Sequence, residues 1–289
     1  MKVCIKCGTR FNNLDWKCTS CNYQPQITDN HLSFAPELSS LNEGFNSEVF
    51  SQLFSYESNN FWFRSRNKII IWALKKYFGD SQNLLEIGCG TGYVLSGIEN
   101  SIPFLSLAGS EIFTEGLKYA SKRVNNVDLF QMDARNIPFD NEFDVIGAFD
   151  VIEHIKEDNL VLEQIYKAVT KGGGIIITVP QHTFLWSQED EYACHVRRYN
   201  SKELKSKVEK AGFKVFMTSS FVSLLFPLMI VSRMQKKKTQ ANFNPGEELK
   251  LNGFLNNAFL WVLALERIFL KIGVRFPFGG SLILIAYKQ

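Results

Sequence analysis

A glycine-rich turn in the first third of the chain has the composition of a ligand-binding loop. Residues 84–87 are an apolar run that contains Glu86, and Gly88, Gly90 and Gly92 follow at every second position. This order is typical of a buried parallel strand that runs into a tight loop and then into a helix. Glycines permit backbone angles closed to other residues, so a ligand can lie directly against the main chain. Glu86 adds negative charge, which suits a ligand with cationic groups and hydroxyls.

The spacing of the glycines narrows the choice of ligand. A dinucleotide site would need G-x-G-x-x-G, whereas this chain has G-x-G-x-G. S-adenosylmethionine carries an ammonium, a sulfonium and a ribose, and it therefore matches the chemistry of the turn. The stretch closely resembles the first motif of class I S-adenosylmethionine-dependent methyltransferases. That resemblance implies an α/β, Rossmann-like fold with a doubly wound, seven-stranded, mostly parallel sheet.

Acidic residues at the ends of the next strands complete the predicted cofactor site. Glu111 follows the second predicted strand, where a carboxylate can accept hydrogen bonds from both ribose hydroxyls. The family resemblance implies that Asp133 accepts from the adenine amino group, with Ala134 and Phe149 also in contact with the cofactor. It further implies that a helix before the first strand covers the cofactor and that Arg66 on this helix reaches its carboxylate.

Titratable residues after the fourth strand and in a later loop are the candidates for catalysis. Asp150, Glu153 and His154 have the spacing of one helical turn, so they could supply a general base, bind a divalent metal or cap the turn. The trio resembles a run in ubiquinone-pathway O-methyltransferases, some of which use magnesium. His195, in the polar and aromatic loop 181–199, begins an H-x-R-R-Y element that resembles one found over the acceptor in small-molecule methyltransferases. His195 is thus the rival of His154 for the role of base.

Four cysteines near the N-terminus form two C-x-x-C pairs with ten residues between them: Cys4, Cys7, Cys18 and Cys21. Four thiolates with this spacing surround one tetrahedral ion, usually zinc, although rubredoxin-like iron uses similar knuckles. A four-thiolate site has no open coordination position. We therefore expect a structural zinc ribbon that could also contact a protein partner, and no catalytic metal there.

These motifs divide the chain into three predicted segments. Residues 1–24 form the zinc ribbon, and residues 25–58 a linker with a short helix. Residues 59–289 form the methyltransferase domain, within which residues 221–275 are an amphipathic helical insertion before the last strand. The apolar stretch before the cysteines expected of a secretory signal is absent, so we expect reduced thiols and a cytoplasmic location.

The insertion has an apolar and basic composition that leaves two interpretations open. One predicted helical face carries apolar residues and the other carries polar ones: Phe254, Ala258, Trp261, Leu265, Ile268 and Ile272 against Asn252, Asn256, Glu266, Arg267 and Lys271. The helix could pack its apolar face onto its own domain. Alternatively, it could lie on a membrane surface, with Lys236–Lys238 meeting anionic head groups.

The sequence favours one function over two others. A formal net charge of +3 is too small to indicate nucleic-acid binding, and the chain lacks the D/N-P-P-F/Y motif of methyltransferases that act on adenine or cytosine. We therefore predict methyl transfer to a small or lipid-linked acceptor, with oxygen as the expected target. The alternatives are a zinc-ribbon ribosomal RNA methyltransferase, and an adaptor that binds the cofactor without turnover.

Overall fold

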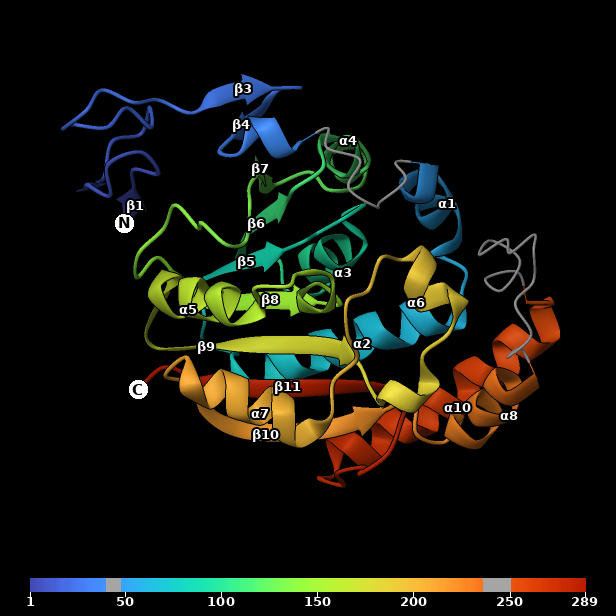
Figure 1. Ribbon diagram of the computed structural model, residues 1–289. Coiled ribbons are helices and arrows are strands. Elements are labelled where there is room, and N and C mark those ends of the chain that lie inside the picture. The colour runs from blue at the N-terminus through green and yellow to red at the C-terminus, as the bar shows by residue number, and fades with distance from the viewer. Residues whose placement is uncertain (40–47, 236–250) are drawn as a thin grey trace.

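The computed structural model describes residues 1–39, 48–235 and 251–289. Nine strands form the main sheet and helices cover both of its faces (Figure 1). The strands are β1 Lys2–Val3, β2 Arg10–Phe11, β3 Gln26–Thr28, β4 His31–Ser33, β5 Asn83–Ile87, β6 Ser106–Glu111, β7 Val127–Gln131, β8 Phe143–Phe149, β9 Val169–Pro180, β10 Lys214–Phe221 and β11 Ser281–Tyr287. The α-helices are α1 Glu48–Tyr56, α2 Phe61–Tyr77, α3 Tyr93–Ser101, α4 Thr114–Arg123, α5 Asp158–Ala168, α6 Gln188–Tyr192, α7 Ser201–Lys210, α8 Phe226–Gln235 and α10 Gly253–Lys271. Short 3-10 turns span Pro36–Leu38, Ile152–His154 and Thr183–Leu185.

The seven predicted strands form the centre of the sheet in the order β10-β11-β9-β8-β5-β6-β7. Strands β5 to β9 pair in parallel, whereas β11 runs antiparallel to both of its neighbours. The central strands are buried on both faces because helices cover both sides of the sheet, as Val145 and Ile146 of β8 illustrate at 0% and 1% exposure. The predicted doubly wound fold is confirmed.

The sheet continues past β7 by two strands that the sequence did not predict. β4 pairs in parallel with β7, with Leu32 opposite Phe130, and β3 pairs antiparallel with β4. Both strands lie within residues 25–58, where we predicted a linker and a short helix, so that prediction is wrong for residues 26–33. Three-residue strands give no measurable alternation of apolar and polar residues, and the free edge of β7 is what orders them.

The cysteine-containing segment packs against the same edge of the sheet. Trp16 is 7% exposed and its ring contacts Phe34 and Phe130 at centroid distances of 4.7 and 6.2 Å. The main chain contributes as well, because Val3 donates to the carbonyl of Pro138 at 2.9 Å. The ribbon is therefore part of the fold and shares its aromatic core with β7.

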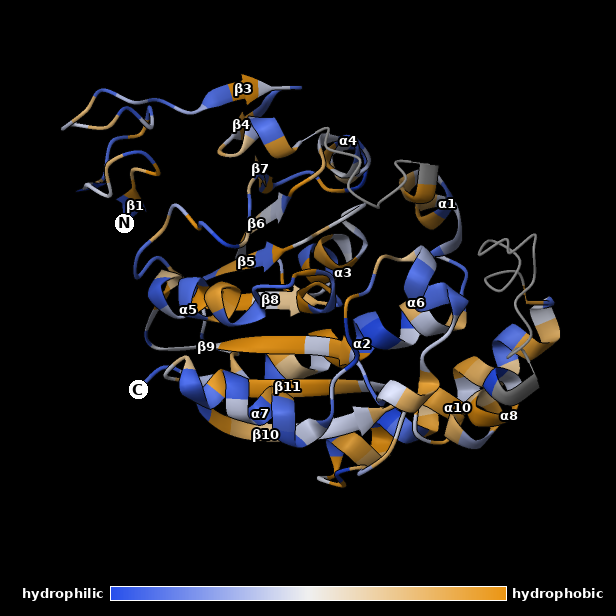
Figure 2. Cartoon of the chain, in the orientation of Figure 1, coloured by the Kyte–Doolittle hydropathy of each residue, from blue (hydrophilic) through white to orange (hydrophobic). Residues whose placement is uncertain are grey.

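Two hydrophobic clusters lie on opposite faces of the sheet. Buried residues of α2, α3, α4 and α10 form one, and those of α5, α7 and the N-terminal segment form the other. Figure 2 shows the apolar strands between these layers, and it also shows that α10 is apolar over much of its surface. The parallel strands all end at the same side of the sheet, where α1, the start of α2 and α6 lie (Figure 1). The candidate site residues follow from those strand ends.

Candidate functional site

The glycine turn between β5 and α3 leaves its main chain open on one side. Gly88 and Gly90 both have positive φ, of 65° and 53°. A Cβ on Gly88 would lie 2.6 Å from Val151 Cγ2, so this glycine is required for packing. A Cβ on Gly90 would meet no atom within 4 Å, so the bare main chain there faces open space. A ligand can therefore approach the backbone at Gly90.

Glu111 at the end of β6 holds the turn in place. Its Oε2 accepts from the backbone N–H of Gly90 at 3.0 Å, and its Oε1 accepts from Ile112 and Phe113 at 2.8 and 3.2 Å. The side chain is 8% exposed, and burial raises its pKa while these N–H donors oppose the rise. These three bonds use both lone pairs of Oε1 and one of Oε2, so the fixed group can still accept from one hydroxyl through Oε2.

Asp133 follows β7, the strand next to Glu111. The backbone N–H of Met132 donates to the carbonyl of Glu111 at 3.1 Å, which keeps the two strand ends together. Arg135 Nε donates to both carboxylate oxygens of Asp133 at 3.0 Å, and Ala134 between them is 7% exposed. The predicted adenine-binding residue is thus an oriented carboxylate.

Two charged groups near the turn have buried atoms without partners in the described structure. Glu86 is 2% exposed and its Oε2 has no hydrogen-bond partner, while Arg66 Nε is also unpartnered. Burial raises the pKa of Glu86 well above its usual range, and the nearby Arg66 guanidinium only partly offsets this. The ammonium and carboxylate of S-adenosylmethionine would supply the missing charges. The residues present therefore fit the cofactor.

A polar cluster that the sequence analysis missed closes the other side of the turn. Thr91 donates to Glu57 Oε2 at 2.5 Å, and the Arg123 guanidinium donates to Thr91 Oγ1 at 2.7 Å and pairs with Glu57. Glu57 lies just after α1, so the cluster ties the end of α1 to the turn. Glu57 and Arg123 are surrounded by ordinary helical sequence, so no local motif marks them.

The three residues predicted to share a helical turn do not act as one group. Asp150 has a φ of 58° and forms an ion pair with Arg66. Glu153 and His154 instead lie with His195, and the ligand atoms of these three are within 4.8 Å of one another. Asp150 stays close enough to Glu153 for its charge to add to the effect of burial, which raises the pKa of Glu153 well above its usual range. The structure therefore adds His195 to Glu153 and His154, while Asp150 pairs with Arg66.

His195 is held by a buried carboxylate. Its Nδ1 is 2.8 Å from Asp190 Oδ1, and Asp190 is 0% exposed. Although burial raises it, hydrogen bonds from His195 and Arg198 hold the pKa of Asp190 below its usual value. An ionised carboxylate only accepts, so Nδ1 donates and Nε2 of the neutral ring is free to take a proton. The sequence analysis assigned no role to Asp190.

The surroundings of His154 favour the neutral form of its imidazole ring. Burial, together with the His195 ring 4.7 Å away, lowers the pKa of His154 to about 3. A general base works best with a pKa near the operating pH, so His154 is poorly suited to that role. Glu153 beside it is 0% exposed, and neither carboxylate oxygen has a partner in the described structure.

The rest of the H-x-R-R-Y element anchors the loop. Arg198 donates from Nε and Nη2 to the two oxygens of Asp190 at 2.7 and 3.0 Å. Arg197 pairs with Asp158 at the start of α5, and the Tyr199 hydroxyl donates to Asp158 at 2.7 Å. These contacts fix the loop on the domain and place His195 beside the end of β8.

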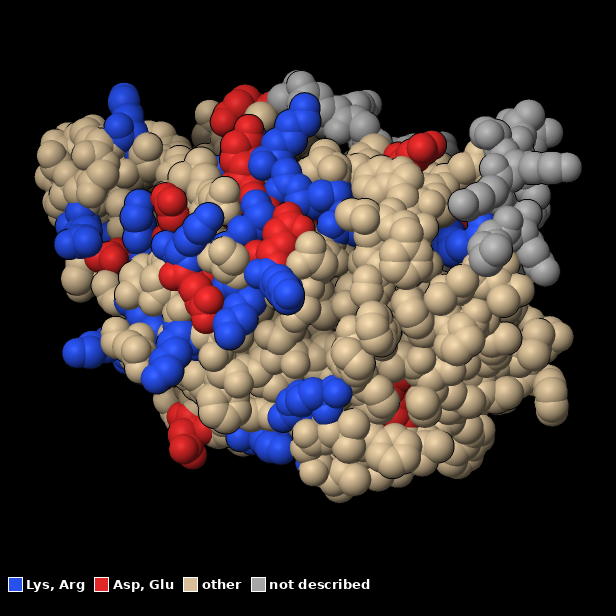
Figure 3. Space-filling model, turned by 60° about the horizontal axis from the view of Figure 1, so that its bottom comes forward, with Lys and Arg blue, Asp and Glu red and all other residues tan. Residues whose placement is uncertain are grey.

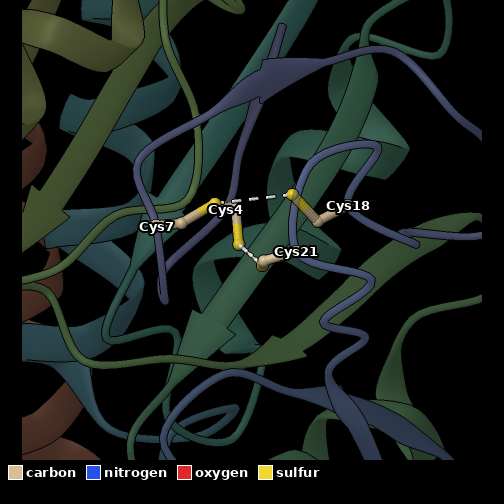
Figure 4. A group of neighbouring side chains, drawn as sticks. All are labelled: Cys4, Cys7, Cys18 and Cys21. Atoms are coloured by element: carbon tan, nitrogen blue, oxygen red, sulfur yellow. Dashed lines mark hydrogen bonds between the residues drawn. The ribbon is translucent and has the colours of Figure 1, made fainter.

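The four N-terminal cysteines converge on one point (Figure 4). Cys4 and Cys21 are 3.6 Å apart at sulfur, as are Cys7 and Cys18, and all four sulfurs lie within 4.8 Å of one another. These distances exclude disulfides, since an S–S bond is about 2.05 Å. Zn–S bonds of about 2.3 Å in a tetrahedron place sulfurs about 3.8 Å apart. The cluster fits a zinc ion.

The fold and the cofactor cradle define a class I S-adenosylmethionine-dependent methyltransferase domain. Residues 57–217 match the family described as methyltransferase domain, and the chain belongs to this family. It is 26% identical over 187 residues to phosphoethanolamine N-methyltransferase 2 of Caenorhabditis elegans, which covers 58% of this chain and 41% of that protein. It is also 26% identical over 159 residues to a probable S-adenosylmethionine-dependent methyltransferase of Mycolicibacterium smegmatis, covering 54% and 60%. The matches span less than two thirds of these relatives.

Solved structures show the same fold. Phosphoethanolamine N-methyltransferase 2 of Haemonchus contortus, in complex with S-adenosyl-L-methionine, aligns with a TM-score of 0.55 at 18% identity, over 86% of this chain and 58% of that one. A methyltransferase of Thermotoga maritima, described as a possible histamine N-methyltransferase, aligns with a TM-score of 0.53 at 18% identity, over 84% and 96%. At this identity the similarity defines the fold alone.

Proposed function

We propose that the protein transfers the methyl group of S-adenosylmethionine to an oxygen of a small or lipid-linked acceptor. The observation that carries the proposal is the pairing of two half-sites at the strand ends. On one side lie Glu86, Glu111 and the open turn at Gly90, which fit the cofactor. On the other lies His195, which the buried Asp190 holds in one tautomer.

On the cofactor side, the residues of the chain bind and orient S-adenosylmethionine. Glu111 accepts from a ribose hydroxyl, Asp133 from the adenine amino group, Glu86 from the ammonium, and Arg66 faces the carboxylate. The sulfonium is already activated, so the protein needs no nucleophile of its own. Alignment of donor and acceptor can contribute about 7–11 kcal/mol to lowering the barrier.

On the acceptor side, a hydroxyl must lose its proton as the methyl group arrives. His195 Nε2 takes that proton, and Asp190 stabilises the imidazolium that forms. A positioned base of this kind contributes about 10²–10⁴-fold. An amine acceptor would need less help from a base, which is why this pair favours oxygen as the target.

A structural zinc ion in the cysteine cluster is part of the proposal. The tetrahedral thiolate set has no open position, so the ion would stabilise the segment that packs on β7 and take no part in the reaction. One zinc per chain is the expected content.

The cluster of Glu153, His154 and His195 supports a second arrangement of the acceptor side, with a divalent cation. Its motivation is that the enclosed carboxylate of Glu153 has no partner in the described structure. A bound cation would polarise the acceptor oxygen, and His195 would then act as a ligand rather than as a base. Titration of the purified protein with Mg²⁺, Mn²⁺ or Zn²⁺ in a calorimeter distinguishes the two arrangements. Cation binding that Glu153→Gln abolishes favours the second.

The decisive experiment uses methyl-labelled S-adenosylmethionine with the full chain and fractionated cell extract. Label in the organic or small-molecule aqueous fraction, lost in His195→Gln and retained in His31→Gln, supports the proposal. His31 is a suitable control because it lies on β4, outside the site. Label in RNA would instead indicate the ribosomal RNA alternative. Cofactor binding in calorimetry without transfer to any fraction would indicate the adaptor.

A further inference from the structure

Helix α10 packs on the domain through Leu263, Leu270 and the carboxylate of Glu266, and it leaves a separate apolar stripe in solvent. Phe254, Trp261, Leu265, Ile268 and Ile272 lie on one side of the helix and are 83%, 77%, 49%, 54% and 72% exposed. Of the two interpretations that the sequence left open, packing of this stripe onto the domain is therefore wrong. α10 is also long and apolar enough to cross a membrane, with a mean hydropathy of 1.3 and 17% of that stretch buried.

Specific hydrogen bonds hold α10 in this orientation. Glu266 is 0% exposed and accepts from the backbone N–H groups of residues 222, 223 and 224 at 2.7, 2.6 and 2.8 Å. Asn256 accepts from the N–H of Phe61 at 2.8 Å and donates to the carbonyl of Asn59 at 2.9 Å. The helix cannot rotate its stripe inward without breaking all of these bonds.

The exposed stripe continues onto neighbouring elements. Leu228 and Val231 of α8 are 56% and 52% exposed, and Phe184 and Phe278 are 62% and 61% exposed. Together with the stripe on α10 they form what we call the apolar face. Figure 3 shows a broad area with few charged residues on this side of the molecule. So many exposed large apolar residues on one side of a protein mark an interaction surface.

The helices that form and flank the apolar face carry mainly basic residues. Helices α2, α8 and α10 contain a single acidic residue in their described parts, the buried Glu266. Arg64 and Lys68 of α2 and Arg267 of α10 lie close together, and none of them forms an ion pair with an acid in the described chain. Partial burial and these two arginines lower the pKa of Lys68. Three neighbouring cations without counter-charges are suited to bind anionic groups.

We propose that the apolar face docks on the surface of a bilayer that contains anionic lipids. The stripe on α10 enters the boundary between head groups and acyl chains, with the helix parallel to the membrane. Arg64, Lys68 and Arg267, which neighbour one another on α2 and α10, bind lipid phosphates, each contributing about 1 kcal/mol. α10 does not cross the membrane, because Glu266 and Asn256 bind it to the domain along its length.

The charges and the exposed aromatic residues favour a lipid surface over a second copy of the chain as the partner of the apolar face. A two-fold dimer would bring this face against its own copy, and the three cations would then repel one another. Exposed aromatic residues flanked by basic ones are typical of helices that lie at a membrane interface.

The face also borders the loop that carries His195. Arg233 of α8 donates to Ser187 Oγ at 2.7 Å and pairs with Glu189, one residue before Asp190. The ring of His182 stacks on Phe184 and Phe278 at centroid distances of 5.0 and 6.0 Å. The acceptor loop therefore sits at the edge of the docking surface.

Vesicle sedimentation of the full chain, without cofactor or acceptor, tests the docking independently of methyl transfer. We expect binding to phosphatidylcholine vesicles that contain phosphatidylglycerol, weaker binding to phosphatidylcholine alone, and weakening by salt. The double variant Phe254→Ser with Trp261→Ser should reduce partitioning by at least about tenfold. Lys68→Gln should reduce it by about fivefold on anionic vesicles. Phe104→Ser is the control, because Phe104 is 64% exposed but lies before β6, away from this face.

Two results would overturn the proposal. The first is a wild-type protein that stays in the supernatant with both kinds of vesicle. The second is a dimer in light scattering that Trp261→Ser dissociates, which would assign the apolar face to a second copy of the chain. Circular dichroism of each variant verifies that the fold is intact.

Discussion

Replacing Glu86 by Gln should move stability and cofactor affinity in opposite directions. The side chain is 2% exposed with an unpartnered Oε2, so in the cofactor-free protein its negative charge is poorly compensated. In the complex the same charge would meet an ammonium. Gln has nearly the same shape as Glu. It removes both the cost of burying the charge in the free protein and the attraction to the ammonium of the cofactor.

The size of each effect follows from the burial of this carboxyl. Its pKa is raised well above 4.5, so the folded state binds a proton that the unfolded state releases, and stability falls as pH rises through that range. The loss of stability is therefore smaller at pH 5 than at pH 7. Glu86→Gln lacks this loss and should melt higher than the wild type at pH 7, by about 2–4 °C for each kcal/mol regained, with a smaller gain at pH 5. Loss of the charge-assisted bond, about 1.5–3 kcal/mol, should weaken cofactor binding by about 10–150-fold.

Differential scanning fluorimetry at several pH values and isothermal titration calorimetry with S-adenosylmethionine measure the two effects. Glu163→Gln is the matched control, since Glu163 is exposed on α5 and should change neither quantity. An unchanged dissociation constant for Glu86→Gln, or a melting temperature below that of the wild type at pH 7, would refute the reasoning.

Three further predictions concern the base, the metal and the helix α10. His195→Gln should lower kcat by about 10²–10⁴-fold with little change in cofactor affinity, because the acceptor hydroxyl then lacks a base. Asp190→Asn should shift the pH dependence of the rate, because Asp190 holds that base. Equal rates for wild type and His195→Gln would exclude this histidine as the base. Elemental analysis should find one zinc per chain, lost in Cys7→Ser and kept in Cys194→Ser; zinc retained without Cys7 would contradict a four-thiolate site. Glu266→Gln should reduce the free energy of unfolding by about 1–3 kcal/mol, because a buried amide cannot replace a carboxylate that accepts from three backbone N–H groups. An unchanged denaturation midpoint would show that these bonds do not hold α10.

The cofactor half of the site could be predicted from sequence because its parts are local. The strand, the turn at Gly88–Gly92 and the acid at Glu111 follow from periodicity and from the geometry of parallel strands, and the structure places Glu111 in contact with the turn. The acceptor half could not be predicted in the same way. Asp190 contacts His195 and Arg198 because the loop folds back on itself. The loop has no helical or strand periodicity from which these contacts could be predicted.

The orientation of α10 could not be predicted either. Helical spacing correctly separates an apolar stripe from a polar one, yet periodicity alone does not say which of them faces the domain. The decision depends on Glu266, whose carboxylate binds the loop after β10. Leu263 and Leu270 are buried beside Glu266, so α10 has apolar residues on both sides and its specific hydrogen bonds select the inward one.

The pairing of the first residues with β7 has a consequence for synthesis on the ribosome. β4 needs the edge strand β7, and the carbonyl of Met1 accepts from Asp140 at 2.8 Å, so this segment must wait until β7 and Asp140 have also been synthesised. A fragment started at residue 57, where the family match begins, would leave β7 as a bare edge that invites pairing between chains. The segment thus closes the sheet only after β7 is in place, although it is translated before β7.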